Sequence, residues 1–293
     1  MISYFIKFFI KYPIEFILFL IFFILFKIFP LSLARNIGSL IATSIGSLLP
    51  VHSIAQKNLE IAFPNEKELW RRKILKEIWH NFGCIMAEYS HLKEILNKRI
   101  DVVNNKYSKD FFDNRSSNII VSAHSSNWEI PGMSCRIKSD KISAIVREPN
   151  NPFIRYFLIS LRKKYSVRCL SKNMNGTKEL IKNFKNGDSI ALLADQQLSS
   201  GLNINFLNKE MNISTLPAQL ALKSKCKLFL GWPVRKSNND FEFEIYECIE
   251  TLNMENNKKN IDIISNKIAT FYEKMIKTYP SQYFWFHNRW KLK

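Results

Sequence analysis

The first 34 residues are the most apolar part of the chain and hold nine of its 23 phenylalanines: Phe5, Phe8, Phe9, Phe16, Phe19, Phe22, Phe23, Phe26 and Phe29. Pro13 is well placed to begin a helix and Pro30 to end one. A helix between them is shorter than the ~20 residues that span a bilayer comfortably. Three interpretations stay open: a short or tilted transmembrane anchor, a helix lying in the membrane interface, or a signal peptide. The signal peptide is the least favoured, because the apolar block is long.

Helical patterns continue beyond this block. Residues 31–50 are apolar with many small residues and predict a second helix, and residues 53–63 predict a short helix before Pro64. Residues 66–96 predict a long helix, since apolar residues recur near helical spacing: Leu69, Ile74, Ile78, Phe82, Ile85 and Met86.

The pattern changes near residue 117, where short β-branched runs alternate with amphipathic segments. The predicted strands are 117–123, 141–147, 167–170, 189–194, 228–234 and 241–249, and the predicted helices are 152–165, 176–184, 215–225 and 257–279. Such alternation is typical of an α/β fold with a mostly parallel, buried central sheet flanked by helices. We expect a membrane anchor at 1–34 and one α/β domain at 35–293, with a helical part at 35–110 and a catalytic sheet at 115–293.

Charge and cysteine content refine this interpretation. The formal net charge of +18 favours an anionic partner such as lipid, nucleic acid or an acidic protein, although a bias toward Lys, Asn and Ile explains the excess equally well. The five cysteines form no Cys-x-x-Cys pair, which argues against a disulfide framework and a structural zinc site. Reduced, buried cysteines fit a cytosolic location for the body of the chain.

The candidate chemistry follows the strand predicted at 117–123. His124 comes directly after it, at the edge where ligands bind in α/β sheets, and Glu129 lies five residues further on. If a turn or helix begins after His124, Glu129 can reach back to the imidazole. That arrangement suits a general base whose tautomer is fixed by a carboxylate. By itself the pair is a weak signal, since a surface histidine and a helix-capping glutamate give the same spacing.

Several further blocks lie in order along the chain. These are Asn58-Leu59 with Ala62-Phe63-Pro64, the His124-x-x-x-x-Glu129 motif with Asn127 and Trp128, Arg147 with Asn150, Asn151 and Pro152, Asp195-Gln196, and a closing group of Pro280, Gln282, Trp285, His287, Arg289, Trp290 and Lys291. With these blocks the chain resembles, over essentially its full length, the bacterial lipid A biosynthesis acyltransferases, the late or secondary lauroyl and myristoyl transferases.

The resemblance implies a glycerol-phosphate-acyltransferase-like fold and an acyl carrier protein thioester as the acyl donor. It implies a hydroxyl of an acylated, phosphorylated disaccharide lipid, a lipid A precursor, as the acceptor. His124 would be the general base and Glu129 its orienting partner. No cofactor or metal is implied, because the donor itself carries phosphopantetheine. The expected location is the inner membrane, with the catalytic domain on the cytoplasmic side.

Five further residues are candidates for substrate binding. Arg147 suits a phosphate of the donor or acceptor, or forms a structural ion pair. Asp195, with Gln196, orients Arg147 or the acceptor sugar, or caps a turn. Asn127 donates to a developing oxyanion or caps a helix. Arg289, in an aromatic setting, binds a head group or packs the carboxyl terminus.

The chain departs from the family pattern at two places. Ser125-Ser126 stands where the family usually has Phe-Gly, and Asn205-Phe206-Leu207-Asn208 lacks the glycine of a Phe-Phe-Gly segment. These changes bear on the acceptor and the acyl chain length more than on the reaction. Two alternatives remain: an acyltransferase for another glycolipid, ornithine lipid or phospholipid, and a non-catalytic basic membrane-binding protein. A nucleic-acid partner is not expected, because no recognisable reading element is present.

Overall fold

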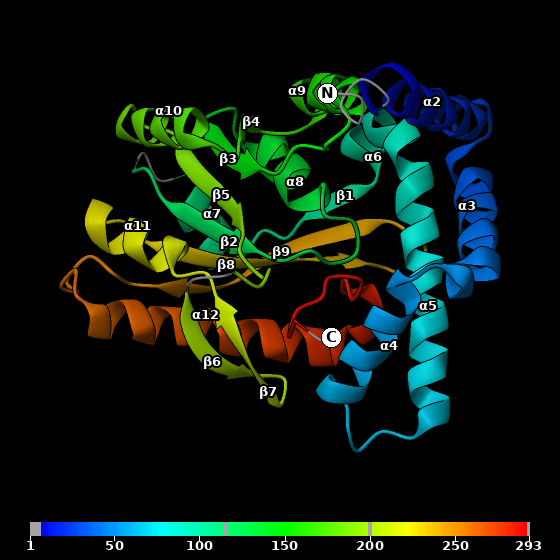
Figure 1. The fold of residues 1–293 in the computed structure, drawn as a ribbon. Coiled ribbons are helices and arrows are strands. Elements are labelled where there is room, and N and C mark those ends of the chain that lie inside the picture. Colours follow the sequence, from blue (N-terminus) through cyan, green and yellow to red (C-terminus); the bar gives the residue numbers. More distant parts are fainter. Residues whose placement is uncertain (1–6, 114–115, 199–200, 292–293) are drawn as a thin grey trace.

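The main sheet has seven strands in the order β1-β9-β8-β2-β5-β3-β4 (Figure 1). The computed structural model describes residues 7–113, 116–198 and 201–291, so residues 1–6 of the predicted anchor lie outside the described residues. The strands are β1 (Ile100–Val102), β2 (Ile119–Ser122), β3 (Ile142–Val146), β4 (Arg168–Ser171), β5 (Ser189–Leu193), β8 (Leu228–Arg235) and β9 (Phe241–Ile249). All neighbours pair in parallel except β8 and β9. The mostly parallel sheet expected from the sequence is therefore confirmed.

Helices surround this sheet. The α-helices are α2 (Tyr12–Ile28), α3 (Leu31–Ile45), α4 (Val51–Ala62), α5 (Glu68–Glu88), α6 (Leu92–Lys98), α7 (Lys106–Asp113), α8 (Ile130–Lys138), α9 (Pro152–Tyr165), α10 (Met174–Lys185), α11 (Leu216–Ser224) and α12 (Lys258–Thr278). The π-helix η1 (Lys7–Lys11) and the short 3₁₀ helices η2 (Gly46–Leu48), η3 (Tyr89–His91) and η4 (Pro280–Gln282) complete the set within the described residues.

Some elements differ from the sequence expectation. The predicted helix 66–96 is broken, since α5 ends at Glu88 and η3 separates it from α6. Strand β1 lies inside the segment 35–110 that was expected to be helical, and it joins the edge of the sheet beside β9. A hairpin of β6 (Leu202–Phe206) and β7 (Lys209–Ile213) was not anticipated. Its turn residues Leu207 and Asn208 both have positive φ, 48° and 71°, as a two-residue hairpin turn of this kind requires.

Alternate residues of β2 face opposite sides of the sheet, and each side has its own core. Ile119 and Val121 belong to the larger core, which includes residues of α11, α12 and the carboxyl-terminal aromatics. Ile120 belongs to the second core, with Cys135 of α8 and Phe243 of β9. Because both faces are covered, the central strands are buried and read as continuous apolar runs.

Helix α2 lies along α9 at one edge of the molecule (Figure 1). Phe16, Phe19 and Phe23 face α9, with ring centroids 4.8 to 6.4 Å from Phe157. Asn151, which caps α9, donates its side-chain amide to the carbonyl of Tyr12 (2.9 Å). The opposite side of α2 is exposed and apolar, and the 22-residue helical stretch Lys7–Ile28 is long and apolar enough to cross a membrane.

Candidate active site

His124 lies at the carboxyl end of β2, where the sheet brings a second strand end beside it. Strands β2 and β5 pair in parallel with Ser122 opposite Leu193, so the residues two positions further along, His124 and Asp195, leave the sheet together. The Nδ1 of His124 donates a hydrogen bond to Oδ1 of Asp195 at 2.7 Å. The imidazole is about one fifth exposed, whereas the carboxylate is fully buried. This leaves Nε2 as the ring nitrogen that remains for a substrate.

Asp195 is held in place by the carboxyl-terminal segment. The Nη1 of Arg289 donates to the Asp195 carbonyl, and Nη2 lies 3.7 Å from its carboxylate. The guanidinium of Arg289 also stacks over the Tyr283 ring at 4.7 Å. Burial alone would raise the pKa of Asp195, but His124 and Arg289 outweigh it and hold that pKa well below its usual range. Asp195 is therefore ionised and oriented toward the imidazole.

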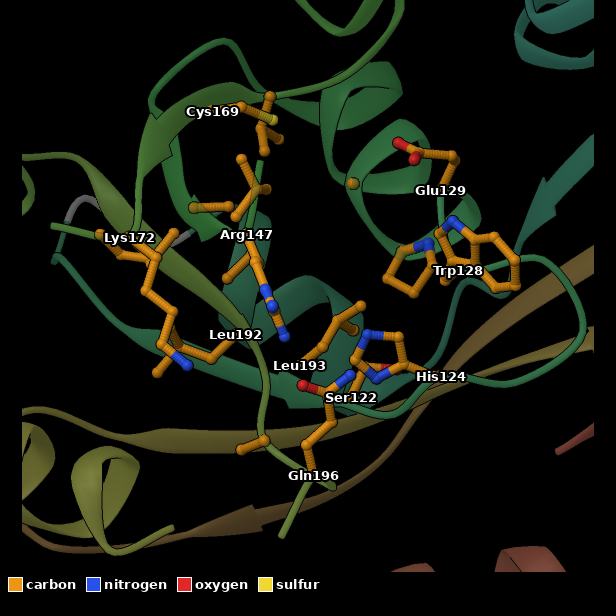
Figure 2. Close-up of a pocket in the computed structure, with 18 of the residues that line it drawn as sticks. Ser122, His124, Trp128, Glu129, Arg147, Cys169, Lys172, Leu192, Leu193 and Gln196 are labelled. Carbon is orange, nitrogen blue, oxygen red and sulfur yellow. The ribbon is translucent and has the colours of Figure 1, made fainter. Parts of the chain in front are cut away.

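Glu129 takes partners other than the expected one. Its carboxylate accepts a bifurcated hydrogen bond from Nε of Arg162 (3.1 Å to each oxygen), one from Nη2 (2.6 Å), and one from the Tyr89 hydroxyl (2.8 Å). The Trp128 indole donates to the same hydroxyl (2.7 Å). In Figure 2 the Glu129 carboxylate lies on the far side of Trp128 from the imidazole. The expected contact of Glu129 with His124 is thus corrected, because the bidentate arginine on α9 satisfies this carboxylate.

A pocket of about 680 Å³ opens beside His124 on the α8 side of the sheet (Figure 2). Its interior is mainly apolar and includes Ile120, Cys135, Ala144, Val167, Ala191 and Phe243. Polar groups at its wall include His124, Glu129, Arg162, Arg147, Lys172 and Gln196, together with Glu148 and Asn150. A concave apolar volume with a few convergent polar groups is the usual form of a ligand site, commonly about 300–1,000 Å³.

Two cations approach this pocket opposite Glu129. Figure 2 shows Arg147, which follows β3, and Lys172, which follows β4, on the side of the pocket away from Glu129. Both side chains line the pocket and both residues are exposed. Gln196, next to Asp195, lines it as well. The structure therefore places Arg147 and Gln196 within the pocket that His124 borders.

Asn127 and Arg289 do not line this pocket. Asn127 is fully buried, and its amide donates to Glu88 (2.8 Å) while its carbonyl accepts from the backbone of Glu129 (3.0 Å). Arg289 is fully buried against Asp195 and Tyr283. Of the two uses expected for Arg289, the geometry agrees with packing of the carboxyl terminus. Asn127 does not cap α8, whose N-cap residue is Glu129; its side chain instead links Glu88 to the backbone amide of Glu129 in the turn before the helix.

Ser126, which stands where the family usually has glycine, has an unusual backbone conformation. Ser126 has φ of 47°, in the left-handed region that glycine adopts without strain. Its amide donates to the Gln282 carbonyl (2.7 Å), and its own carbonyl accepts from the Asn81 side chain (2.8 Å). The turn after His124 is therefore built with serine in a conformation that explains why a glycine is usual there.

Sequence reasoning did not identify Tyr89, Arg162 and Lys172. Arg162 precedes Lys163 and Lys164 at the end of α9, so it resembled a cluster that favours a helix carboxyl end. Tyr89 lies in the turn that interrupts the predicted long helix. No local spacing links either residue with Glu129, and only the tertiary fold brings them together.

A cluster of metal-ligating residue types lies elsewhere. Ligand atoms of Asp110, Cys248 and Glu250 lie within 4.8 Å of one another. The ammonium of Lys227 already contacts Asp110 (2.8 Å) and Glu250 (3.3 Å). A metal ion would have to displace this lysine, and none of these residues lines the His124 pocket.

Comparison with known proteins gives a family match. A family model described as bacterial lipid A biosynthesis acyltransferase matches residues 7–292. No curated protein sequence matches the chain. Among solved structures, the chain is similar to the crystal structure of the 1-acyl-sn-glycerophosphate (LPA) acyltransferase PlsC from Thermotoga maritima. That match has a TM-score of 0.39 and 12% identity, and it covers 85% of this chain and 98% of the other.

Proposed function

Because this chain belongs to the bacterial lipid A biosynthesis acyltransferase family and is an acyltransferase, we propose that it moves a fatty acyl group from an acyl carrier protein thioester to a hydroxyl of a lipid A precursor. The observation that carries this proposal is the His124–Asp195 pair at the wall of the apolar pocket. The pocket suits an acyl chain, since each methylene removed from water contributes about 0.8 kcal/mol.

His124 is the general base of the proposed reaction. Its Nε2 takes the proton from the acceptor hydroxyl as the hydroxyl oxygen attacks the thioester carbonyl carbon. The new ester bond forms, the carbon–sulfur bond breaks, and the imidazolium returns the proton to the leaving thiolate. Asp195 keeps Nδ1 protonated and stabilises the imidazolium, as in other histidine–carboxylate pairs. This revises the sequence expectation, in which Glu129 had that role.

Glu129 is assigned a different part in the reaction. With Arg162 and Trp128 it forms one wall of the pocket, and the Tyr89 hydroxyl behind this wall bonds both Glu129 and Trp128. A bidentate arginine–carboxylate pair between the His124 loop and α9 fixes the width of the pocket at this wall. We assign the wall to orienting the thioester relative to His124.

Arg147 and Lys172 are assigned to phosphate recognition. Phosphates are present in both proposed substrates, on the donor arm and on the disaccharide. A guanidinium suits phosphate oxygens geometrically, and a lysine adds a point charge. Gln196, which follows Asp195 and lines the pocket, is assigned to the acceptor sugar.

The remaining parts of the proposal concern partners and location. The exposed apolar side of α2 is compatible with membrane association, and we propose the inner membrane with the pocket on the cytoplasmic side. The net charge of +18 favours binding of the acidic carrier protein, because opposite charges attract the two partners and orient them as they meet.

The test uses the full chain in detergent or vesicles with acyl carrier protein thioesters. The acceptors supplied side by side are a lipid A precursor, an ornithine lipid and a phospholipid, and lipid masses are read by mass spectrometry. A mass increase of one fatty acyl group on the lipid A precursor supports the proposal. The same increase on only one of the other lipids overturns the acceptor, and no increase with any donor overturns the reaction.

A further inference from the structure

A second buried carboxylate, Glu88, lies behind the turn that carries His124. It ends α5, is fully buried and does not line the pocket. Two arginines pair with it: Arg35 of α3 donates from Nε (2.6 Å), and Arg235 of β8 donates from Nη1 and Nη2. Burial alone would raise the pKa of Glu88, but Arg235, Arg35 and Asn127 lower it below its usual range. Glu88 is therefore an anion between two buried cations.

This anion holds the turn after His124 directly. The remaining hydrogen bond to its Oε2 comes from the amide of Asn127 (2.8 Å), and the Asn127 carbonyl in turn accepts from the backbone of Glu129 (3.0 Å). One buried side chain thus joins α5 to the start of α8. Since the Asn127 amide has both its polar atoms engaged, its orientation is fixed by Glu88 on one side and by the turn on the other.

A longer path of hydrogen bonds links Glu88 to Ser126, the residue before Asn127. Arg235 donates from Nε to the side-chain oxygen Oδ1 of Asn81 (2.8 Å). The side-chain nitrogen Nδ2 of Asn81 in turn donates to the backbone carbonyl of Ser126 (2.8 Å). Ser126 is the residue with the strained positive φ. Such a conformation persists only where surrounding contacts enforce it.

The same cluster reaches the amino-terminal helices. Arg35 lies in the first part of α3, which packs so closely on α5 that a Cβ added to Gly38 would clash with the Gly83 carbonyl oxygen. Close approach of these two helices brings Arg35 to Glu88. The apolar helix α2 leads directly into α3, so the cluster ties the proposed membrane-facing part to the active site.

We propose that Glu88 is the positioning residue of the His124 turn, acting through Asn127 and through the Arg235–Asn81–Ser126 path, and this role rests on the proposed function. Glu88 touches no substrate. It sets the backbone from 125 to 128 and so the direction of the imidazole. A shift of about 1 Å in a reacting group costs on the order of 100-fold in rate.

The test exchanges donor and acceptor across the Glu88–Asn127 contact. In Glu88→Gln the new amide faces the Asn127 amide, and in Asn127→Asp two carboxylates face each other. The double variant E88Q/N127D restores a hydrogen bond, now donated by the new amide to the new carboxylate, and keeps one negative charge in the cluster, moved from position 88 to position 127. The arginines can still donate to the side-chain oxygen at position 88, which accepts from both in the wild type. Glu94→Gln is the matched control, because Glu94 on α6 pairs with Arg99 just after that helix (3.2 Å) and does not contact the turn.

Each single variant is expected to lower kcat about 10- to 100-fold with KM within about threefold, and the double variant to regain about tenfold. Asn127→Ser, which leaves both arginine pairs of Glu88 intact, covers the case in which a charge variant fails to fold, and it is expected to lose about tenfold in kcat. Singles with wild-type kcat, or a double variant whose loss equals the product of the single losses, would overturn the role of Glu88.

A second readout separates this inference from the proposed reaction. The rate of carbethoxylation of His124, followed by peptide mass spectrometry, needs no substrate. The singles are expected to change it at least threefold relative to wild type and Glu94→Gln, and the double variant to restore it. If wild type transfers no acyl group, the proposed function fails while this readout still decides on Glu88; an unchanged labelling rate in the singles overturns the positioning role.

Discussion

Asp195 and Glu129 are both buried carboxylates beside the His124 turn, yet their surroundings differ. Asp195 comes from the neighbouring strand end and bonds the imidazole, with Arg289 behind it. Glu129 comes from the same turn as His124 and bonds Arg162 and Tyr89. Closeness in sequence therefore does not decide which carboxylate reaches the histidine. The register of two parallel strands decides it.

The largest effect is expected for Asp195→Asn. Asparagine keeps the size but favours the wrong imidazole tautomer, and in a comparable histidine–carboxylate pair this change costs about 10⁴-fold in kcat. We expect a loss of about 10³- to 10⁴-fold in kcat with little change in KM, measured by acyl transfer at saturating donor. Asp188→Asn is the control, since Asp188 is a buried carboxylate paired with Arg168 outside the pocket. An Asp195→Asn enzyme within tenfold of wild type would contradict the assignment.

The second prediction concerns Glu129→Gln, which changes the other of the two carboxylates. Removing this charge leaves Arg162 buried without its carboxylate, which costs about 3–5 kcal/mol for a broken buried pair. We expect a lower free energy of unfolding in urea and a loss of roughly 10- to 100-fold in transfer from the displaced wall. A loss as large as that of Asp195→Asn at unchanged stability would show that Glu129 acts on the reaction itself.

Part of this comparison could be read from the sequence. The β-branched runs predicted the central strands to within a few residues, because strands covered on both faces must be apolar throughout. His124 and Asp195 were each placed at a strand end, but strand order is a tertiary property and the sequence did not say that β2 and β5 are neighbours. For the same reason Arg162 and Tyr89 carried no signal. The three-residue strand β1 was missed, because so short a strand shows no period.

The pocket gives a third prediction, independent of either carboxylate. Ala144 on β3 lines the pocket and is only partly buried, so Ala144→Phe places a ring in the space assigned to the acyl chain. Excluding about four methylenes at ~0.8 kcal/mol each predicts a roughly 200-fold shift in preference toward shorter donors. Competition between a long and a short acyl donor in one tube measures this ratio and corrects for any loss of folded protein. An unchanged ratio would show that the acyl chain of the donor does not bind in this part of the pocket.

The smallest effect is expected for the pH dependence of stability, through His287 in the carboxyl-terminal segment that packs behind Asp195. Burial and the charge of Arg289 lower the pKa of His287 from 6.5 to about 4. The unfolded chain then binds more protons than the folded one between these values, so stability is lost as pH falls from about 6.5 to about 4. In His287→Gln the free energy of unfolding is expected to fall by about 1–2 kcal/mol less than in wild type over this pH range, once solvent screening is included. An equal slope in wild type and variant would contradict the shift.

The central claim is that His124 performs acyl transfer to a lipid A precursor, and the most direct measurement compares wild type with His124→Ala. Both proteins are incubated with an acyl carrier protein thioester and the purified precursor, and the lipid is weighed by mass spectrometry over time. The account predicts a gain of one fatty acyl group with wild type and loss of about 10³-fold or more in that rate with His124→Ala. Full transfer by His124→Ala would contradict it.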